Sequence, residues 1–173
     1  KNLSRKLSDD VDEMEKMLHE YLQFASTGAK EKTENFDLSE LVENLINKYE
    51  NSNISHDFKK RIYFNGRKIL IQRCINNLID NSIKYGKKTN IIIEKKISNI
   101  IISIEDDGPG ISKSEYKNVI KPFYKIDKSR SESKSSVGLG LAISSDIIKS
   151  HGGEMNFGKS NLGGLKIVIS LPV

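Results

Sequence analysis

The chain contains 173 residues, of which 36% are hydrophobic and 29% charged, a size and balance that suit one soluble domain with a small appendage. No apolar run approaches the roughly 18 residues needed to cross a bilayer, so we expect no membrane contact from this chain. The net charge of +5 comes from lysines and arginines scattered among 23 acidic residues, which argues against a basic nucleic-acid-binding stripe and is weak evidence for an anionic ligand.

The first 27 residues predict one long amphipathic helix. Its apolar positions alternate in steps of four and three, which keeps them on one side of a helix that needs a partner. These positions are Leu7, Val11, Met14, Leu18, Tyr21 and Ala25.

A polar stretch separates this helix from the rest of the chain. We therefore predict three parts: the helix at residues 1–27, a linker at residues 28–35 and a folded domain at residues 36–173. The chain opens with charged residues instead of an apolar signal segment, and it lacks an initial Met. We therefore interpret it as a fragment of a longer protein.

The folded domain is predicted to begin with a short amphipathic helix that Asp37 or Ser39 caps. The strand pattern of residues 61–64 then ends at Asn65-Gly66, a dipeptide typical of a tight turn. Apolar residues at helical spacing predict the next helix over residues 69–85.

Four further segments have strand patterns. Residues 90–97 and 100–105 predict a hairpin through Ser98-Asn99, and residues 154–158 and 165–171 flank a turn that contains Gly163 and Gly164.

Helices and a loop lie between these strands. Residues 112–115 form a capping-box pattern, Ser-Lys-Ser-Glu, that predicts a short helix ending before Pro122. Residues 124–137 lack apolar periodicity and predict a mobile loop, and residues 139–150 predict another helix. The alternation of helices and strands indicates an α+β fold, a two-layer α/β sandwich.

The sequence Asp106-Asp107-Gly108-Pro109-Gly110-Ile111 directly follows the strand pattern of residues 100–105. An Asp carboxylate at this position can accept a hydrogen bond from an amino group such as the adenine N6. The glycines permit positive φ and let a ligand approach the backbone. The same residue types also form ordinary turns, so the motif alone leaves a nucleotide pocket and a plain turn both open.

The helix at residues 69–85 carries Asn77, Asn81 and Lys84 on one face. An Asn carbonyl oxygen is a suitable ligand for Mg²⁺, which takes most of its other ligands from water and phosphate. Lys84 would then contact phosphate, and Tyr85 would pack beside a base. An ordinary solvated helix face has the same residue types, so this segment also has two interpretations.

The sequence Ser136-Val137-Gly138-Leu139-Gly140-Leu141 places glycines where a loop meets the next helix. Backbone N–H groups and the helix dipole at such a junction attract phosphate. Close helix packing or a hinge would use the same glycines. The preceding loop is basic, as a lid over a polyphosphate or any exposed lysine-rich loop would be, with Lys121, Lys125, Lys128, Arg130 and Lys134.

The order of these motifs is more specific than any one of them. Four motifs follow one another in the chain: an Asn-rich helix, D-x-G-x-G, Pro122-Phe123-Tyr124-Lys125-Ile126-Asp127 and G-L-G-L. This series resembles the N, G1, F and G2 boxes of the sensor histidine kinase ATP-binding domain, a member of the GHKL superfamily. The resemblance covers about Phe36 to Val173 and implies a Bergerat fold, with helices on a mixed sheet and ATP between the Asn helix and the lid. The heptad segment is similar to the second helix of that family's dimerisation and histidine-phosphotransfer domain.

The resemblance also implies residue roles. Asn81 matches the Asn that binds Mg²⁺, and Asp106 matches the Asp that reads adenine N6. ATP and Mg²⁺ are therefore the expected ligands. Ser136 departs from the pattern, because many members have a Gly there. The other residues that match the ATP-binding boxes are Asn77, Lys84, Tyr85, Gly108, Gly110, Ile111, Phe123, Lys125, Gly138, Leu139, Gly140 and Leu141.

Asn77 bears on the type of reaction. Superfamily members that hydrolyse ATP, such as DNA gyrase and heat-shock chaperones, have a Glu one helical turn before the metal-binding Asn, where it can activate water. Here that position is Asn77, and a neutral amide cannot act as a general base. The resemblance therefore favours transfer of the γ-phosphoryl group to a histidine over hydrolysis.

The histidines of the chain do not match a phosphoacceptor. His19 has an acidic neighbour but lacks the Pro of the family's acceptor motif, His56 falls in a polar stretch and His151 at a helix end. We therefore expect the acceptor histidine to lie upstream, and we expect this fragment alone not to phosphorylate itself. We assign no certain catalytic side chain.

Cys74 is the only cysteine, which excludes an internal disulfide and is typical of a reducing cytoplasm.

The resemblance implies a response regulator as partner, together with the protein's own phosphotransfer helix in a homodimer, and a cytoplasmic location as part of an inner-membrane sensor protein. Two alternatives stay open. A GHKL ATPase or anti-sigma serine kinase is disfavoured by Asn77 and the heptad helix. A nucleotide-free interaction module is disfavoured by the retention of Asn81, Asp106 and the motif glycines.

Overall fold

The computed structural model describes residues 11, 14, 15, 18, 22, 31–50, 52–58, 60–126 and 138–173. Its elements in chain order are β1 (Glu34–Asp37), α2 (Leu38–Ile46), β2 (Asn53–Asp57), β3 (Tyr63–Gly66), α3 (Lys68–Tyr85), β4 (Lys88–Lys95), β5 (Asn99–Asp106), the 3₁₀ helix η1 (Lys113–Glu115), α4 (Gly140–Ser150), β6 (Glu154–Lys159) and β7 (Leu165–Pro172).

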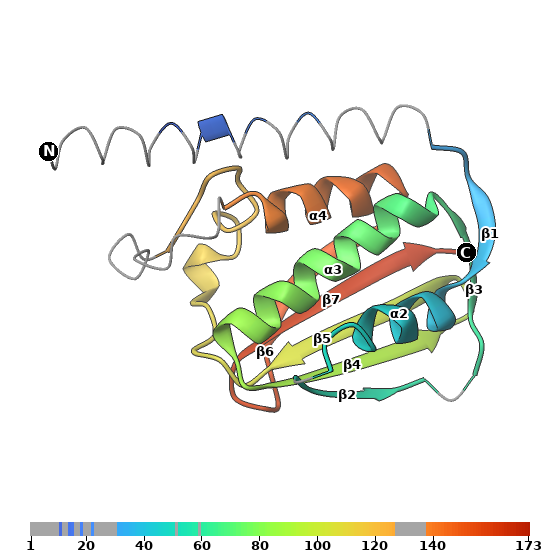
Figure 1. Ribbon diagram of the computed structural model, residues 1–173, viewed down its shortest axis with the longest axis horizontal. Helices are drawn as coiled ribbons and strands as arrows, with labels where there is room; N and C mark the ends of the chain where they lie inside the picture. The colour runs from blue at the N-terminus through green and yellow to red at the C-terminus, as the bar shows by residue number, and fades with distance from the viewer. Residues whose placement is uncertain are drawn as a thin grey trace, which may run out of the picture.

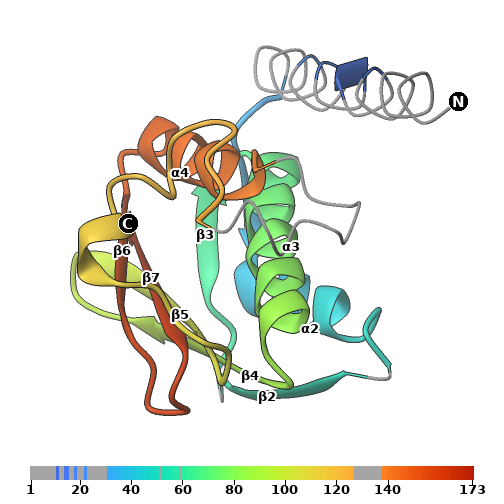
Figure 2. The ribbon, with the colours of Figure 1, turned by 90° about the vertical axis from the view of Figure 1, so that its left-hand side faces the viewer.

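The main sheet has five strands in the order β2-β4-β5-β7-β6, and β1 pairs with β3 in a separate two-stranded sheet. The β2–β4 pair is parallel, and the other neighbours are antiparallel. Helices α2, α3 and α4 cover one face of the five-stranded sheet (Figures 1 and 2). The prediction of a two-layer α+β sandwich with a mixed sheet is therefore confirmed.

Alternating strand residues and one helix stripe build the core. The side chains of Ile91, Ile102 and Ile169 lie on the helix-covered face of three neighbouring strands, and each is fully buried. On α3, the side chains of Ile71, Ile75, Leu78 and Ser82 share one face, which is buried against this sheet. Burying one such aliphatic side chain contributes about 1.5–3 kcal/mol, so this stripe holds α3 firmly in place and leaves its other face for polar residues.

Asp37 caps α2, which confirms one of the two predicted capping residues. Its Oδ1 accepts a hydrogen bond from the Glu40 N–H at 3.1 Å. Ser39 has another function: its hydroxyl donates to the Lys60 carbonyl and accepts from the Ile62 N–H, which ties the helix to the chain before β3.

Two local predictions are wrong. Asn65-Gly66 is not a turn, because both residues extend β3 and pair with Glu34 and Asn35 of β1. The residues 112–115 do not form a capping box: Ser112 makes no capping hydrogen bond, and the segment is a single 3₁₀ turn. Glu115 instead accepts a hydrogen bond from the Tyr124 hydroxyl, which removes the acid that the box needs.

The N-terminal seam is described at three of its predicted positions. Val11, Met14 and Leu18 have helical backbone and exposed side chains, and the other seam positions lie outside the described residues. Among the described residues, no helix is long and apolar enough to cross a membrane. The boundaries of the three predicted parts stay a prediction, although β1 already begins at Glu34.

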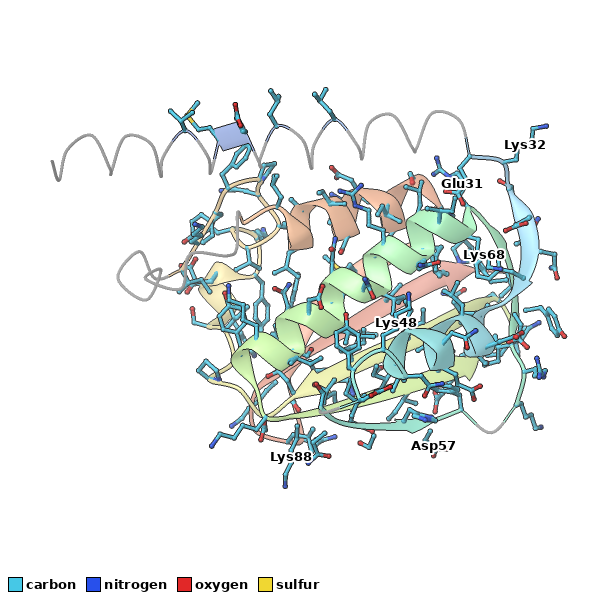
Figure 3. All side chains as sticks on the ribbon, viewed as in Figure 1. Glu31, Lys32, Lys48, Asp57, Lys68 and Lys88 are labelled. Carbon is cyan, nitrogen blue, oxygen red and sulfur yellow. The ribbon has the colours of Figure 1, made fainter. Side chains whose placement is uncertain are left out.

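The N-terminal end of α3 is capped from a distant part of the chain. Arg67, the residue before the helix, makes no side-chain capping bond, and the Glu31 carboxylate accepts hydrogen bonds from the N–H groups of Ile69 and Leu70. Figure 3 shows Glu31 and Lys68 at this end of the helix and Lys88 near the other end. A carboxylate at a helix start is favourable because it meets unpaired N–H groups and the positive end of the dipole.

His151 belongs to the same end of the fold. Its Nε2 accepts a hydrogen bond from the Arg67 N–H at 3.1 Å, and its Nδ1 donates to the Ile147 carbonyl at 2.7 Å. Both contacts can form only with the neutral imidazole. Burial, aided by the Arg67 charge, lowers the pKa of His151 below its ordinary 6.5, although the Ile147 bond and Glu31 oppose this shift.

We expect His151 to make the folding stability pH-dependent. Because its pKa is lower in the folded state, the unfolded chain binds more protons below about pH 6.5, so stability is full above that pH and falls as the pH drops towards the folded pKa. Chemical unfolding from pH 7.5 to 5 measures the slope, which His151→Gln should reduce. A slope that His151→Gln leaves unchanged would exclude His151 as a cause of the pH dependence.

Candidate nucleotide-binding site

The amide face of α3 lies against the start of α4. The Asn77 Nδ2 donates to the Gly140 carbonyl at 3.4 Å. A Cβ atom on Gly140 would lie 3.8 Å from the Asn77 Cβ and 4.0 Å from the Asn81 Nδ2. Asn77 and Gly140 are 63 residues apart in the sequence. The structure therefore brings together two distant motifs, the Asn helix and the glycine junction.

Asp106 ends β5 with its carboxylate already oriented. Its Oδ1 accepts hydrogen bonds from the Gly108 N–H at 2.9 Å and the Leu165 N–H at 3.0 Å. Within the described part of the chain, both hydrogen bonds of this side chain are made by Oδ1. Oδ2 is the oxygen that stays available to a ligand, and a carboxylate oxygen accepts hydrogen bonds from an amino group.

The glycines of this turn permit close backbone contacts. A Cβ on Gly108 would lie 2.8 Å from the Tyr85 carbonyl oxygen, so the turn packs directly on the end of α3. Gly110 has φ +69, a conformation that favours glycine. The next-door Asp107 accepts hydrogen bonds from the N–H groups of Lys87 and Lys88, which locks the turn to the start of β4.

Lys84, in the last turn of α3, lies within reach of the charge of Lys125. Partial burial lowers the pKa of Lys84, and the charge of Lys125 lowers it further. The Lys84 ammonium also lies 5.5 Å from the centre of the Tyr85 ring. Like charges held close together favour the binding of an anion between them, and a triphosphate is such an anion.

The F-box residue Phe123 and the glycine Gly138 lie side by side. The Phe123 N–H donates to the Gly138 carbonyl at 3.0 Å. Both residues have positive φ, 64° for Phe123 and 76° for Gly138. A non-glycine residue with such a φ is uncommon and marks a constrained backbone, and the Phe123 side chain is 55% exposed.

The remaining predicted residues differ in what they can offer a ligand. Leu139 is buried in the core, so its side chain is not exposed to a ligand, whereas Ile111 and Leu141 are half-buried. Residues 127–137 of the predicted lid lie outside the described residues; they include Lys128, Arg130, Lys134 and Ser136.

The donor set around Asn81 suits Mg²⁺ bound together with a phosphate. Within the described ranges, no three His, Cys, Asp or Glu side chains gather to hold a metal ion by themselves. Asn81 is half-buried and offers one neutral oxygen. Mg²⁺ commonly takes one or two protein ligands and fills its remaining positions with water and phosphate oxygens, so a single amide is consistent with this ion.

Sequence reasoning missed one part of the site. The turn between β6 and β7 touches Asp106 through Leu165 and through the Gly164 N–H, which donates to the Asp106 carbonyl at 3.1 Å. The glycines of this turn were the available signal in the sequence. The pairing of β5 with β7 brings them to Asp106, and this pairing joins strands that are far apart in the sequence.

A cavity of about 290 Å³ lies elsewhere, beside α2, where Lys48 and Lys68 line it.

Comparison with known proteins agrees with this geometry. Residues 66–173 match the model of the family described as histidine kinase-, DNA gyrase B- and HSP90-like ATPase. The sensor histidine kinase GtrS of Pseudomonas aeruginosa is 28% identical over 172 residues, which are 98% of this chain and 36% of GtrS. The sensor histidine kinase CpxA of Escherichia coli is 34% identical over 104 residues, 60% of this chain and 23% of CpxA. The matched residues thus span 36% of the length of GtrS and 23% of the length of CpxA.

Solved structures show the same fold. The catalytic domain of histidine kinase ThkA, in a nucleotide-free form, has a TM-score of 0.72 at 21% identity and covers 82% of this chain and 95% of that domain. Full-length ShkA in complex with AMPPNP has a TM-score of 0.77 at 18% identity, covering 97% of this chain and 37% of ShkA. The chain therefore belongs to the histidine kinase-, DNA gyrase B- and HSP90-like ATPase family, and it carries an ATP-binding catalytic domain of the sensor histidine kinase type.

Proposed function

We propose that this chain binds ATP with Mg²⁺ and transfers the γ-phosphoryl group to a histidine on a preceding segment of the parent protein. Asp106 accepts a hydrogen bond from the adenine N6, Asn81 ligates Mg²⁺, and Lys84 and Lys125 neutralise phosphate. The backbone at Gly138 and Gly140 meets the phosphates at the start of α4. Bound Mg²⁺ supplies charge neutralisation on the transferred group, and the residues of the chain orient the nucleotide.

The single observation that carries transfer over hydrolysis is the chemistry of α3 at position 77. The Asn77 amide is held by the Gly140 carbonyl and cannot remove a proton from water. The only acidic residue of α3 is Asp80, which accepts a hydrogen bond from the Tyr49 hydroxyl at 2.7 Å on the side of the helix that faces α2. The helix therefore presents no general base at the site, and a phosphoryl acceptor has to come from elsewhere.

The further parts of the proposal concern the parent protein. The exposed apolar positions Val11, Met14 and Leu18 support a helix that pairs in the phosphotransfer domain of a homodimer. From the histidine, the phosphoryl group would pass to an Asp of a response regulator. The names of GtrS and CpxA as sensor kinases support these partners and a cytoplasmic location next to a membrane sensor.

Phosphorylation in trans tests the proposal. The chain is incubated with ATP, Mg²⁺ and the separately produced preceding segment that bears the acceptor histidine. We expect an acid-labile, base-stable phosphate on that segment, ADP formed in equal amount, and loss of both with a His→Ala acceptor. Release of inorganic phosphate at the same rate with and without the acceptor would show a hydrolase instead.

A further inference from the structure

We propose that Glu105 is a positioning residue for the adenine-reading Asp106: it holds the β6–β7 turn, residues 160–165, from the opposite face of the sheet and thereby sets the orientation of the Asp106 carboxylate. Glu105 itself would not touch the nucleotide. The inference rests on the proposed role of Asp106, and it adds a second residue on which base selection depends.

Glu105 and Asp106 are neighbours at the end of β5, so their side chains leave opposite faces of the sheet. Asp106 lies on the face that the helices cover, together with Ile104. Glu105 lies on the other face, where its side chain is only 4% exposed. Both carboxylates nevertheless bind the same turn, because β7 is the neighbour of β5 and brings the turn to its end.

Three groups hold the Glu105 carboxylate. Its Oε2 accepts hydrogen bonds from the Ser160 hydroxyl at 3.1 Å and the Asn161 N–H at 2.9 Å. Its Oε1 pairs with the Lys166 ammonium at 2.9 Å. These contacts lie at both ends of the turn, so the Glu105 carboxylate connects the end of β6 to the start of β7. A buried carboxylate with a full set of partners holds its neighbours in one geometry.

The turn transmits this position to Asp106 as a closed unit. The Ser160 N–H donates to the Gly164 carbonyl at 2.9 Å, and the Gly163 N–H donates to the Ser160 carbonyl at 3.1 Å. At the far end, the N–H groups of Gly164 and Leu165 donate to the Asp106 carbonyl and Oδ1. Ser160, which Glu105 holds, is thus linked to the two residues that hold Asp106.

Steric contact leaves the turn little freedom. A Cβ on Gly164 would lie 2.2 Å from the Asp106 Oδ1 and 2.4 Å from the Gly108 nitrogen, far inside van der Waals contact. The backbone of the turn therefore forms a wall directly against the base-reading carboxylate. If the turn moves away, Oδ1 loses the Leu165 N–H and keeps the Gly108 N–H alone, so the carboxylate is held by one hydrogen bond instead of two and Oδ2 points less firmly towards a base.

This linkage predicts a change in base selection, which a purely structural role of Glu105 would not produce. Selection is measured as the ratio of the dissociation constants of purine riboside triphosphate, which lacks only the N6 amino group, and ATP. Glu105→Gln removes the charge that Lys166 needs, so we expect the ratio to fall by about fivefold, with inorganic triphosphate binding unchanged. Equal weakening of both nucleotides, or an unchanged ratio, would overturn the inference.

The chain offers a matched control. Glu94, on the neighbouring strand β4, forms an exposed ion pair with Lys96 at 2.7 Å, and Lys96, followed by the charge of Lys166, lowers the pKa of Glu94. Among the described residues its carboxylate bonds to Lys96 and not to the β6–β7 turn, so Glu94→Gln removes a charge that acts on Lys166 without breaking a bond to the turn, and it should leave the ratio at the wild-type value. A fall in the ratio with Glu94→Gln as large as with Glu105→Gln would overturn the inference, because it would reflect a general loss of charge.

Two further variants separate the possible failures. Ser160→Ala removes one hydrogen bond from Glu105 without a change of charge, and it serves as the test if Glu105→Gln does not fold. We expect Ser160→Ala to lower the ratio of the dissociation constants less than Glu105→Gln does. An unchanged ratio would contradict the linkage between Glu105 and Asp106. Asp106→Asn tests the base reader itself. If Asp106→Asn leaves the ratio unchanged, the proposed role of Asp106 fails; if only Asp106→Asn lowers it, the role of Glu105 alone fails.

Discussion

Asp106→Asn is expected to weaken ATP binding by about 10- to 100-fold, the effect of losing a hydrogen bond to a charged group inside a site. The structure gives the reason for so large an effect from a nearly isosteric change. The Gly108 and Leu165 N–H groups need an acceptor at the Oδ1 position, so the amide oxygen of Asn will occupy it. The amide NH₂ then takes the place of Oδ2, and a donor faces the donor of adenine N6.

Calorimetric titration with a non-hydrolysable ATP analogue measures this change. Asp107→Asn is the matched control, because Asp107 is the adjacent residue and, within the described part of the chain, its Oδ1 accepts hydrogen bonds from the backbone N–H groups of Lys87 and Lys88. The control should bind ATP as the wild type does. Undiminished ATP affinity in Asp106→Asn would remove Asp106 from the site.

The second large effect is expected from Asn81→Ala, which should abolish the increase in ATP affinity that Mg²⁺ produces, a loss of about tenfold or more. The fold should persist, because Asn81 is half-buried and lies beside the core stripe of α3, on the side that faces the start of α4. Affinity without Mg²⁺ should change little, since the base contact at Asp106 is untouched.

Titration with ATP at several Mg²⁺ concentrations separates the affinity that depends on Mg²⁺ from the affinity that does not. Asn76→Ala is the control: it removes the same type of side chain from the same helix, on the side where Tyr49 of the α2 region contacts it at 3.4 Å. This variant should keep the full Mg²⁺ dependence. If Asn81→Ala keeps it too, Asn81 is not the Mg²⁺ ligand.

The parts of the fold that could be predicted are those with a local pattern. The spacing of Ile71, Ile75 and Leu78 predicts α3 because a helix repeats its face every three to four residues, and all three are buried. The β4–β5 hairpin was predictable for the same reason, since its strands are adjacent in sequence. The site motifs on α3 and after β5 follow directly from these two elements.

The parts that could not be predicted depend on distant pairing. Glu34 and Asn35 were assigned to a linker, but they pair with residues some 30 positions later, where Gly66 is the partner of Glu34. The polar strand β2 is a parallel edge strand without apolar alternation, so its sequence resembles a loop. Gly164 likewise reads as an ordinary turn residue until the β5–β7 register places it against Asp106.

Chemical-shift mapping with Mg²⁺ and a non-hydrolysable ATP analogue tests most directly whether the four motifs form one nucleotide site. The amide signals of the ¹⁵N-labelled chain are followed during the titration. We predict saturable shifts in all four motifs, at Asn77 to Tyr85, Asp106 to Ile111, Phe123 to Lys125 and Gly138 to Leu141, and also in the turn from Ser160 to Leu165. Absence of saturable shifts, or shifts confined to the cavity beside α2 that Lys48 and Lys68 line, would contradict the account.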